Sequence, residues 1–177
     1  MDAKERRLVR RLAAGEPEAF AALYDEYGRD LYGYLLARTR RAHRAEDLLQ
    51  VVMLRLVRSR HRLKAVLSLR AYLFTMARNE WLRAGAAQEP DSERASAEDP
   101  AAPHADDEAD VGALRRAMNR LAPERREVVG LKIHHGLTFA QIGEVLAIPP
   151  DTAASRYRRA LADLRRMLET TDVDIRP

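Results

Sequence analysis

The sequence predicts an all-helical protein of two small helical domains joined by an acidic flexible linker. Three observations support this fold class. The 177 residues are 33% charged with only 8 Gly and 8 Pro, and no alternating run of β-branched residues predicts a strand. Hydrophobic residues make up 46% of the chain and recur at helical spacing. Residues 86–110 lack that spacing and contain three prolines, which predicts a linker.

Charge is distributed unevenly along the chain. The net charge is +4, but residues 86–110 contain nine acidic groups and one arginine, a sum of −8, so the remainder carries +12. A basic body favours polyanionic partners such as nucleic acid. Cysteine is absent, which excludes disulfides and thiolate chemistry and suits a reducing compartment. No signal peptide or membrane-spanning run is recognisable, so we expect a cytoplasmic protein without direct membrane insertion.

Two helices are predicted at the N-terminus. Residues 5–14 form the first, which Gly15 ends, and Pro17 fits the first turn of a second helix that runs to about Thr39. A periodic apolar stripe usually packs in a core, so the aromatic residues of the second helix are expected there. The stripe comprises Phe20, Leu23, Tyr24, Tyr27, Leu31, Tyr34 and Leu35.

Residues 44–60 predict a third helix with two distinct faces. Its inward positions are Leu49, Val52, Met53 and Leu56. A second face follows the i, i+3, i+7, i+11 pattern through Asp47, Gln50, Leu54 and Arg58. A solvated face does not need a leucine, so a partner surface and an ordinary solvent-exposed face both stay open.

A basic loop at 61–67 precedes a helix that Ser68 caps. In this helix aromatic residues alternate with basic and amide side chains, which suits single-stranded nucleic acid because an unstacked base can stack on a ring. Leu73, Met76 and Ala77 are expected in the core. For Tyr72 and Trp81, core packing and base stacking both stay open. The interleaved residues are Tyr72, Phe74 and Trp81 with Arg70, Arg78, Asn79 and Arg83.

The second domain begins with an amphipathic segment at 111–121. Pro123 then opens a helix that Gly136 ends, and residues 169–177 are expected to fray. The second of these helices is expected to pack through Val128, Val129, Leu131 and Ile133.

A helix-turn-helix follows at 138–161. Thr138 and Gln141 form a capping box, Pro149 and Pro150 end the first helix, and small Gly143 stands where the helices approach. The second helix starts near Asp151 and carries arginines that can bind phosphate or guanine in the major groove. Its inward face is predicted to be Ala153, Tyr157, Leu161, Leu164 and Leu168, and its outward face Thr152, Ser155, Arg156 and Arg159. A merely solvated basic face is the alternative.

Nothing in the sequence predicts catalysis, a cofactor or a metal site. No glycine-rich phosphate loop or nucleophile elbow is present, and adjacent His134 and His135 lack the i, i+4 spacing of a helical metal pair. We therefore expect a protein that is not an enzyme.

Taken together, the segments resemble the extracytoplasmic-function class of bacterial RNA polymerase sigma factors. The likeness covers almost the whole chain and implies a region-2-like domain at 1–85, the linker at 86–110, a region-4-like domain at 111–170 and a tail at 171–177. The motifs are LYDEYGRDLYGYLLARTR at 23–40, AEDLLQ at 45–50, AYLFTMARN at 71–79, LAPERREVV at 121–129 and TFAQIGEVLAIPPDTAASRYRRALADLRRML at 138–168.

The resemblance implies partners and contact residues. The partners are core RNA polymerase, through its clamp helices and flap, promoter DNA and a possible anti-sigma factor. Polymerase contacts fall on Asp47, Gln50, Leu54 and Arg58. Minus-ten contacts, where the promoter is opened, fall on Arg60, His61, Arg62, Lys64, Tyr72, Arg78, Asn79, Trp81 and Arg83. Minus-thirty-five contacts fall on Thr152, Ser155, Arg156, Arg158 and Arg159.

Some residues depart from the usual pattern of the class. Val51 and Met53 replace a usual glutamate and phenylalanine, and Tyr72 replaces a tryptophan. Ala147 replaces the usual corner glycine, so either a left-handed alanine costs about 1 kcal/mol or more there, or the turn differs. The alternative function is a stand-alone helix-turn-helix transcription regulator whose first domain senses a signal or dimerises.

Overall fold

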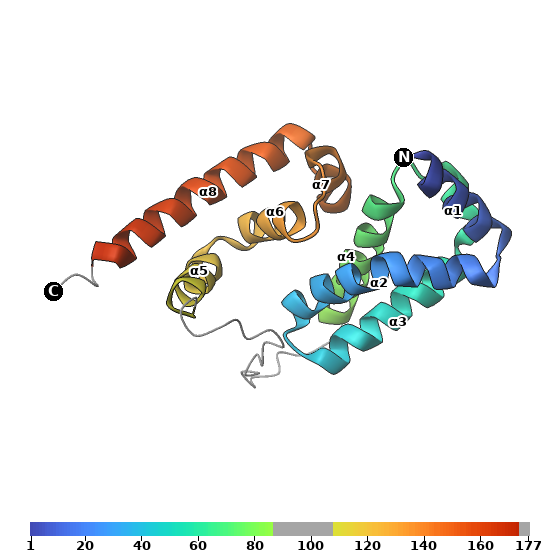
Figure 1. The fold of residues 1–177 in the computed structure, drawn as a ribbon, viewed down its shortest axis with the longest axis horizontal. Coiled ribbons are helices and arrows are strands. Elements are labelled where there is room, and N and C mark those ends of the chain that lie inside the picture. The colour runs from blue at the N-terminus through green and yellow to red at the C-terminus, as the bar shows by residue number, and fades with distance from the viewer. Residues whose placement is uncertain (87–107, 174–177) are drawn as a thin grey trace. The chain divides into compact units, whose positions relative to one another are not determined.

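The structure, a computed structural model, describes residues 1–86 and 108–173 (Figure 1). All regular structure in these two ranges is helical, which confirms the predicted fold class. The helices form two compact units, the first built on α1 to α4 and the second on α5 to α8. The predicted linker lies outside the described residues except at its ends, Ala86 and residues 108–110, which are helical.

Five helical segments build the first unit. Gly15 ends the first of them in a left-handed conformation, as predicted. The basic stretch predicted as a loop is a short 3-10 helix, η1, instead. The segments are α1 (Ala3–Ala14), α2 (Pro17–Thr39), α3 (Ala42–Arg58), η1 (Arg60–Ala65) and α4 (Leu69–Ala86).

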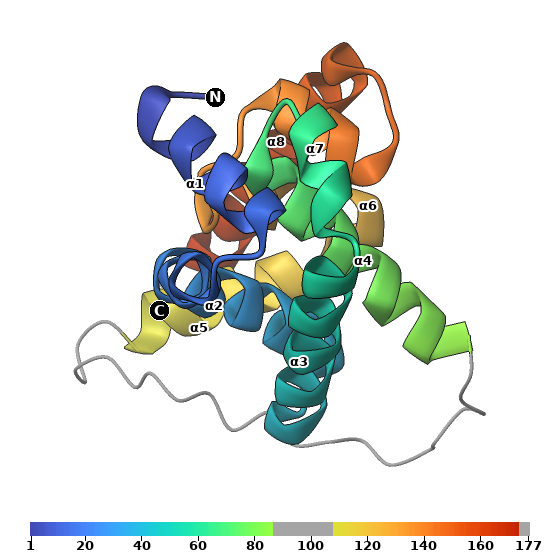
Figure 2. The ribbon, with the colours of Figure 1, turned by 90° about the vertical axis from the view of Figure 1, so that its right-hand side faces the viewer.

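The core of the first unit lies where α2, α3 and α4 pack against one another (Figure 2). Tyr34 and Phe74 meet edge to face at its centre, with ring centroids 5.3 Å apart. The aromatic stripe of α2 is buried or half-buried as predicted, with one exception. Tyr24 is 54% exposed, because it stands at the edge of the stripe and faces a surface groove between α2 and α3.

Charged side chains reinforce this core at its rim. Arg70 of α4 forms an ion pair with Asp30 of α2. The guanidinium carbon of Arg38 lies 3.5 Å from the ring centroid of Tyr34 and 5.6 Å from that of Trp81. Cation–π contacts of this kind favour one orientation of the rings.

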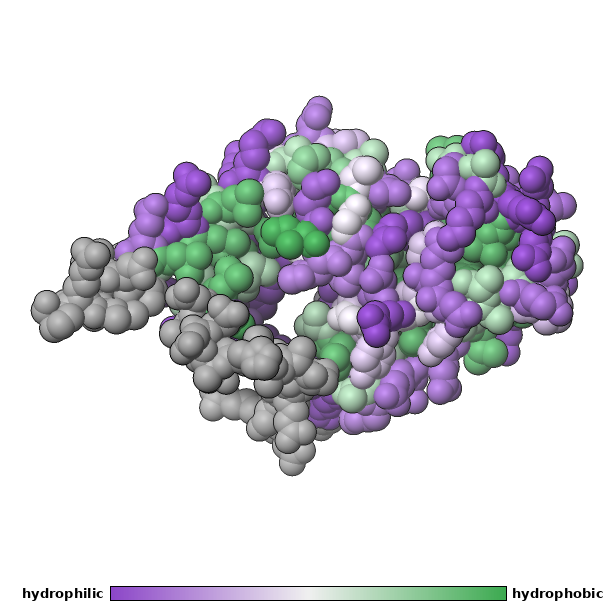
Figure 3. All heavy atoms as spheres, in the orientation of Figure 1, coloured by the Kyte–Doolittle hydropathy of each residue, from purple (hydrophilic) through white to green (hydrophobic). Residues whose placement is uncertain are grey.

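The second unit consists of four helices around a smaller core. Ala117, Leu121, Val129, Ala160 and Leu164 form one buried cluster, and Val128, Leu131, Leu137, Ile142, Val145, Leu146 and Ala153 are also buried. Figure 3 shows hydrophobic side chains gathered over α5 and α8 on the visible face. The helices are α5 (Glu108–Arg120), α6 (Pro123–Ile133), α7 (Phe139–Leu146) and α8 (Pro150–Val173).

Several sequence predictions for the second unit need correction. Leu161 is exposed and Ala160 is buried in its place, because the covered stripe of α8 runs through Ala153, Ala160 and Leu164. Ile133 is exposed because α6 ends there. Helix α8 continues to Val173 rather than fraying from residue 169.

The helix-turn-helix corner has the predicted chemistry. Both hydrogen bonds of the capping box form, 2.8 Å from Thr138 N to Gln141 Oε1 and 3.2 Å from Gln141 N to Thr138 Oγ1. Ala147 adopts the left-handed conformation, with φ 55°. A Cβ added to Gly143 would stand 2.7 Å from the carbonyl oxygen of Ile148. The left-handed position of this corner is therefore occupied by alanine, in which the Cβ causes strain, and not by glycine.

Within the described ranges, no helix combines the length and the apolar character needed to cross a membrane.

Replacing Ala147 with glycine is expected to stabilise the second unit by about 0.5–1 kcal/mol, because glycine adopts the left-handed conformation without the Cβ penalty. Gly143→Ala is expected to destabilise it by about 1–3 kcal/mol through the clash with Ile148. Urea unfolding followed by circular dichroism measures both changes. Fluorescence of Trp81, the only tryptophan, reports the first unit and should not change.

The stability of the first unit is expected to fall as pH rises from about 10 to about 12. Burial, aided by the carboxylates of Glu26 and Glu5, raises the pKa of Tyr27 to about 12. Above pH about 10 the unfolded chain loses this proton while the folded chain keeps it, so the free energy of unfolding declines. The free energy of unfolding of the Tyr27→Phe variant, measured by urea titration, should decline less over this pH range. An equal decline in the variant would contradict the assignment.

Candidate functional site

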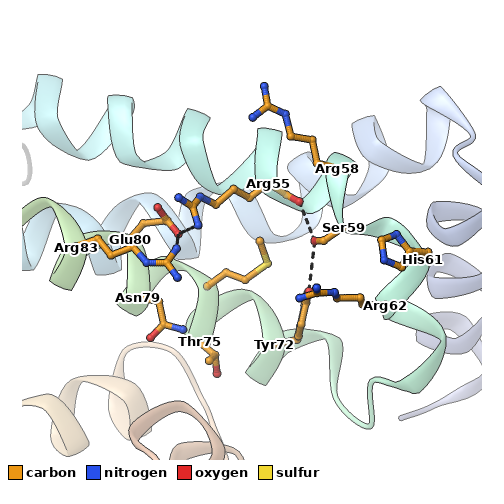
Figure 4. Close-up of a pocket in the computed structure, with 11 residues that line it drawn as sticks. Arg55, Arg58, Ser59, His61, Arg62, Tyr72, Thr75, Asn79, Glu80 and Arg83 are labelled. Carbon is orange, nitrogen blue, oxygen red and sulfur yellow. Dashed lines mark hydrogen bonds and ion pairs between the residues drawn. The ribbon is translucent and has the colours of Figure 1, made fainter.

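A basic cleft of about 420 Å³ opens between α3, η1 and α4 (Figure 4). It combines guanidinium groups with aromatic, hydroxyl and amide side chains, the set that suits a nucleotide with its phosphates. The lining residues are Arg55, Arg58, Ser59, His61, Arg62, Tyr72, Thr75, Met76, Asn79, Glu80 and Arg83.

Glu80 organises the charge of the cleft. Its side chain is 7% exposed, and its Oε1 atom lies 3.0 Å from Nη1 of Arg55 and 2.9 Å from Nη1 of Arg83 (Figure 4). The buried carboxylate therefore joins α3 to α4 and holds two arginines at the cleft wall. Arg58 and Arg62 remain exposed, so the cleft keeps a net positive charge.

Tyr72 takes part in both the packing and the cleft. It is half-buried, lines the cleft, and its hydroxyl lies 3.5 Å from Oγ of Ser59. Trp81 is also half-buried but does not line the cleft, and its ring contacts Arg38 instead. Of the two residues, only Tyr72 lines this cleft, and base stacking on either ring stays a prediction.

The predicted minus-ten residues divide into two groups. His61, Arg62, Tyr72, Asn79 and Arg83 line the cleft. Four others are absent from its lining, namely Arg60, Lys64, Arg78 and Trp81. Whether any of them contacts DNA stays a prediction.

Some cleft residues were missed by sequence reasoning. Thr75 was not predicted, and Met76, which was predicted in the core, is half-buried and lines the cleft instead. Both continue the helical face that contains Tyr72, Asn79 and Arg83, so periodicity from Tyr72 could have found them. Arg55 and Glu80 had no such signal, because their pairing depends on how α3 packs on α4.

A second surface, the α2–α3 groove, has a volume of about 950 Å³. Gln50 and Leu54, two residues of the predicted partner face, line it, and Leu54 is 56% exposed. That a partner binds there stays a prediction. Asp47 is exposed but outside the lining, whereas Arg58 lines the basic cleft instead. The full lining is Tyr24, Asp25, Gly28, Arg29, Tyr32, Glu46, Leu49, Gln50, Met53 and Leu54.

The third candidate surface is the N-terminal half of α8. Arg158 and Arg159 are exposed, and the other predicted contacts, Thr152, Ser155 and Arg156, are half-buried. The rings of Phe139 and Tyr157 lie 5.6 Å apart and fix α7 against α8. None of the predicted DNA contacts on this helix is fully buried.

Comparison with known proteins identifies the family of each unit. Residues 23–89 match Sigma-70 region 2, and residues 112–164 match Sigma-70 region 4. The RNA polymerase sigma factor CarQ of Myxococcus xanthus is 31% identical over 172 residues, covering 94% of this chain and 99% of CarQ. The ECF RNA polymerase sigma factor SigK of Mycobacterium ulcerans is 31% identical over 174 residues, covering 93% of both chains.

Solved structures share the fold. CnrH, solved in complex with the cytosolic domain of CnrY, has a TM-score of 0.66 and 20% identity, covering 93% of this chain and 97% of its own. The sigma factor RpoE of Bartonella quintana, in complex with the anti-sigma factor NepR, has a TM-score of 0.63 and 23% identity, covering 85% and 96%.

The chain belongs to the extracytoplasmic-function RNA polymerase sigma factors. It therefore binds core RNA polymerase and directs promoter recognition and transcription initiation. The alternative of a stand-alone regulator is not favoured.

Glu80→Gln is expected to destabilise the first unit by about 1–2 kcal/mol, because the neutral amide cannot pair with both arginines. The cost is moderate, since Arg55 and Arg83 are partly exposed and water can solvate them. Urea unfolding followed by Trp81 fluorescence measures the change. Arg166→Ala, which removes an exposed pair with Asp163 in the other unit, is the matched control and should leave this transition unchanged.

Proposed function

We propose that three surfaces divide the work of this sigma factor. The exposed face of α3 binds the polymerase clamp helices through Asp47, Gln50 and Leu54. The basic cleft and η1 take the separated minus-ten strand. The N-terminal half of α8 enters the major groove of the minus-thirty-five element through Thr152, Ser155, Arg156, Arg158 and Arg159, while the region-4-like domain docks on the flap.

One observation carries the proposal for the first unit: α3 serves both the groove and the cleft. Glu46, Leu49 and Gln50 line the α2–α3 groove, and one to two turns further Arg55 and Arg58 line the cleft. A polymerase bound along α3 would therefore fix the cleft relative to the melted strand. This supports moving Arg58 from the polymerase contacts to the minus-ten contacts.

The chemistry of the cleft supports binding of single-stranded DNA. Arg58 and Arg62 can neutralise backbone phosphates. A base turned out of the duplex could stack on Tyr72 and form hydrogen bonds with Asn79 or Thr75. Each such stack is worth about 1–3 kcal/mol, comparable to the cost of unstacking one base.

We further propose that the protein performs no catalysis itself and acts in the cytoplasm, where polymerase and promoters are. An anti-sigma factor would control it by covering the α2–α3 groove, where exposed Tyr24 and Leu54 offer apolar contacts. CnrH and RpoE, which share the fold, were solved with bound partner proteins.

Asp47→Arg is expected to weaken binding of core polymerase at least about tenfold, because it reverses a charge within the proposed contact face. Leu54→Asp should act similarly by removing the exposed apolar contact. Arg156→Ala, which alters only the proposed minus-thirty-five surface, should bind core polymerase normally. Pull-down of core polymerase by the tagged full chain measures all three. Normal retention of both α3 variants would contradict the proposed face.

A further inference from the structure

Helix α1 packs along η1, the 3-10 helix that brings His61 and Arg62 to the cleft. Its apolar face, Leu8, Val9 and Leu12, is buried. On the η1 side Leu63 is fully buried. The match to Sigma-70 region 2 begins at residue 23, so α1 lies outside the matched segment and yet contacts η1 within it.

At the N-terminal end of α1, a hydrogen bond joins this helix to a distant part of the chain. Oε1 of Glu5 accepts from the backbone N–H of Leu69, at 2.8 Å. Leu69 is the first residue of α4, directly after the η1 connection. Ser68 already caps this helix by accepting from Ala71 N at 3.2 Å, so Glu5 satisfies a donor that the local cap leaves over. Its negative charge also suits a helix N-terminus.

The second end is at the turn between α1 and α2. Gly15 has φ 84°, and a Cβ added there would stand 3.1 Å from Nε of Arg60. The side chain of Arg60, the first residue of η1, therefore lies against this glycine. Helix α1 thus touches η1 and its flanks at both ends.

A 3-10 helix needs such support. Runs longer than about 3–4 residues are uncommon because the hydrogen-bond geometry is poorer than in an α-helix. The η1 run has 6 residues, of which four are exposed and basic or histidine: Arg60, His61, Arg62 and Lys64. Mutual repulsion of the three cations, Arg60, Arg62 and Lys64, adds to the cost of the conformation.

We propose that α1 is a brace that holds η1 in the shape that presents His61 and Arg62 to the promoter, with Glu5 as its positioning residue. The inference rests on the proposed role of the cleft in minus-ten binding. Glu5 does not touch DNA in this scheme. It acts by fixing the start of α4, which sets where η1 ends.

The test uses holoenzyme assembled from core polymerase and the full chain. The promoter is one that the wild-type protein uses, identified by mapping its transcription starts. Glu5→Ala removes the acceptor for Leu69 N–H. It should lower promoter opening, measured as permanganate reactivity of unpaired thymines, by about three- to tenfold. The affinity for core polymerase, measured by competition, should stay within about twofold, since the α3 face is unchanged.

Two variants serve as matched controls. Glu5→Gln keeps an amide oxygen that can accept from Leu69 N–H, so it should retain opening near the wild-type level. Lys4→Ala changes the residue next to Glu5 on α1 and breaks its exposed ion pair with Glu26 of α2, in which Nζ lies 3.0 Å from Oε2, without touching α4. It should leave opening unchanged. Trp81 fluorescence verifies that each variant is folded at the assay temperature.

Combining Glu5→Ala with Arg62→Ala tests whether the effect passes through η1. The double variant should lose less than the product of the two single effects. Multiplicative effects of the two substitutions would overturn the proposal. Normal promoter opening with Glu5→Ala would also overturn it, as would a loss with Glu5→Gln as large as that with Glu5→Ala. A parallel loss of affinity for core polymerase would overturn it too. If Arg62→Ala itself opens promoters normally, the proposed role of the cleft is wrong. If only Arg62→Ala is defective, the brace alone is wrong.

Discussion

The first unit depends on one buried carboxylate. Glu80 stands between α3 and α4 and pairs with an arginine from each helix, Arg55 and Arg83. Without it, two guanidinium groups would repel each other beside a cleft that already contains Arg58, His61 and Arg62. A single negative charge thus allows α3 and α4 to pack closely, while the cleft between them keeps a net positive charge that attracts a polyanion. The proposed nucleic-acid site on this small helical bundle depends on this balance between stability and charge.

The position of α3 makes that compromise useful. The same helix contributes core residues, one wall of the α2–α3 groove and one wall of the cleft. Since a helix is rigid over this length, docking a partner along one face orients the other. In the proposed function, polymerase binding and strand capture are therefore coupled through a rigid element, without a conformational switch. The second unit adds an independent contact, and two modest contacts on one enzyme gain affinity through effective concentration.

Local sequence signals predicted most of the fold because they act over a few residues. The capping box at Thr138, the left-handed Gly15 and the prolines at helix starts all appear where the sequence placed them. Helical periodicity also identified the exposed Leu54 and the buried residues of α3. It was wrong at the edges of apolar stripes, at Tyr24 and Leu161. The sequence of a helix does not specify how much of the width of its apolar stripe the neighbouring helices cover.

By itself, the sequence determined the helical class, the division into two units and the helix-turn-helix. These properties follow from spacing, capping and composition, which are local. Only the tertiary structure decided that Arg58 joins the cleft rather than the groove, that Glu80 pairs with Arg55, and that Glu5 reaches Leu69 across 64 residues of chain. Such contacts depend on how whole helices pack, and packing sums many weak interactions that no short stretch of sequence contains.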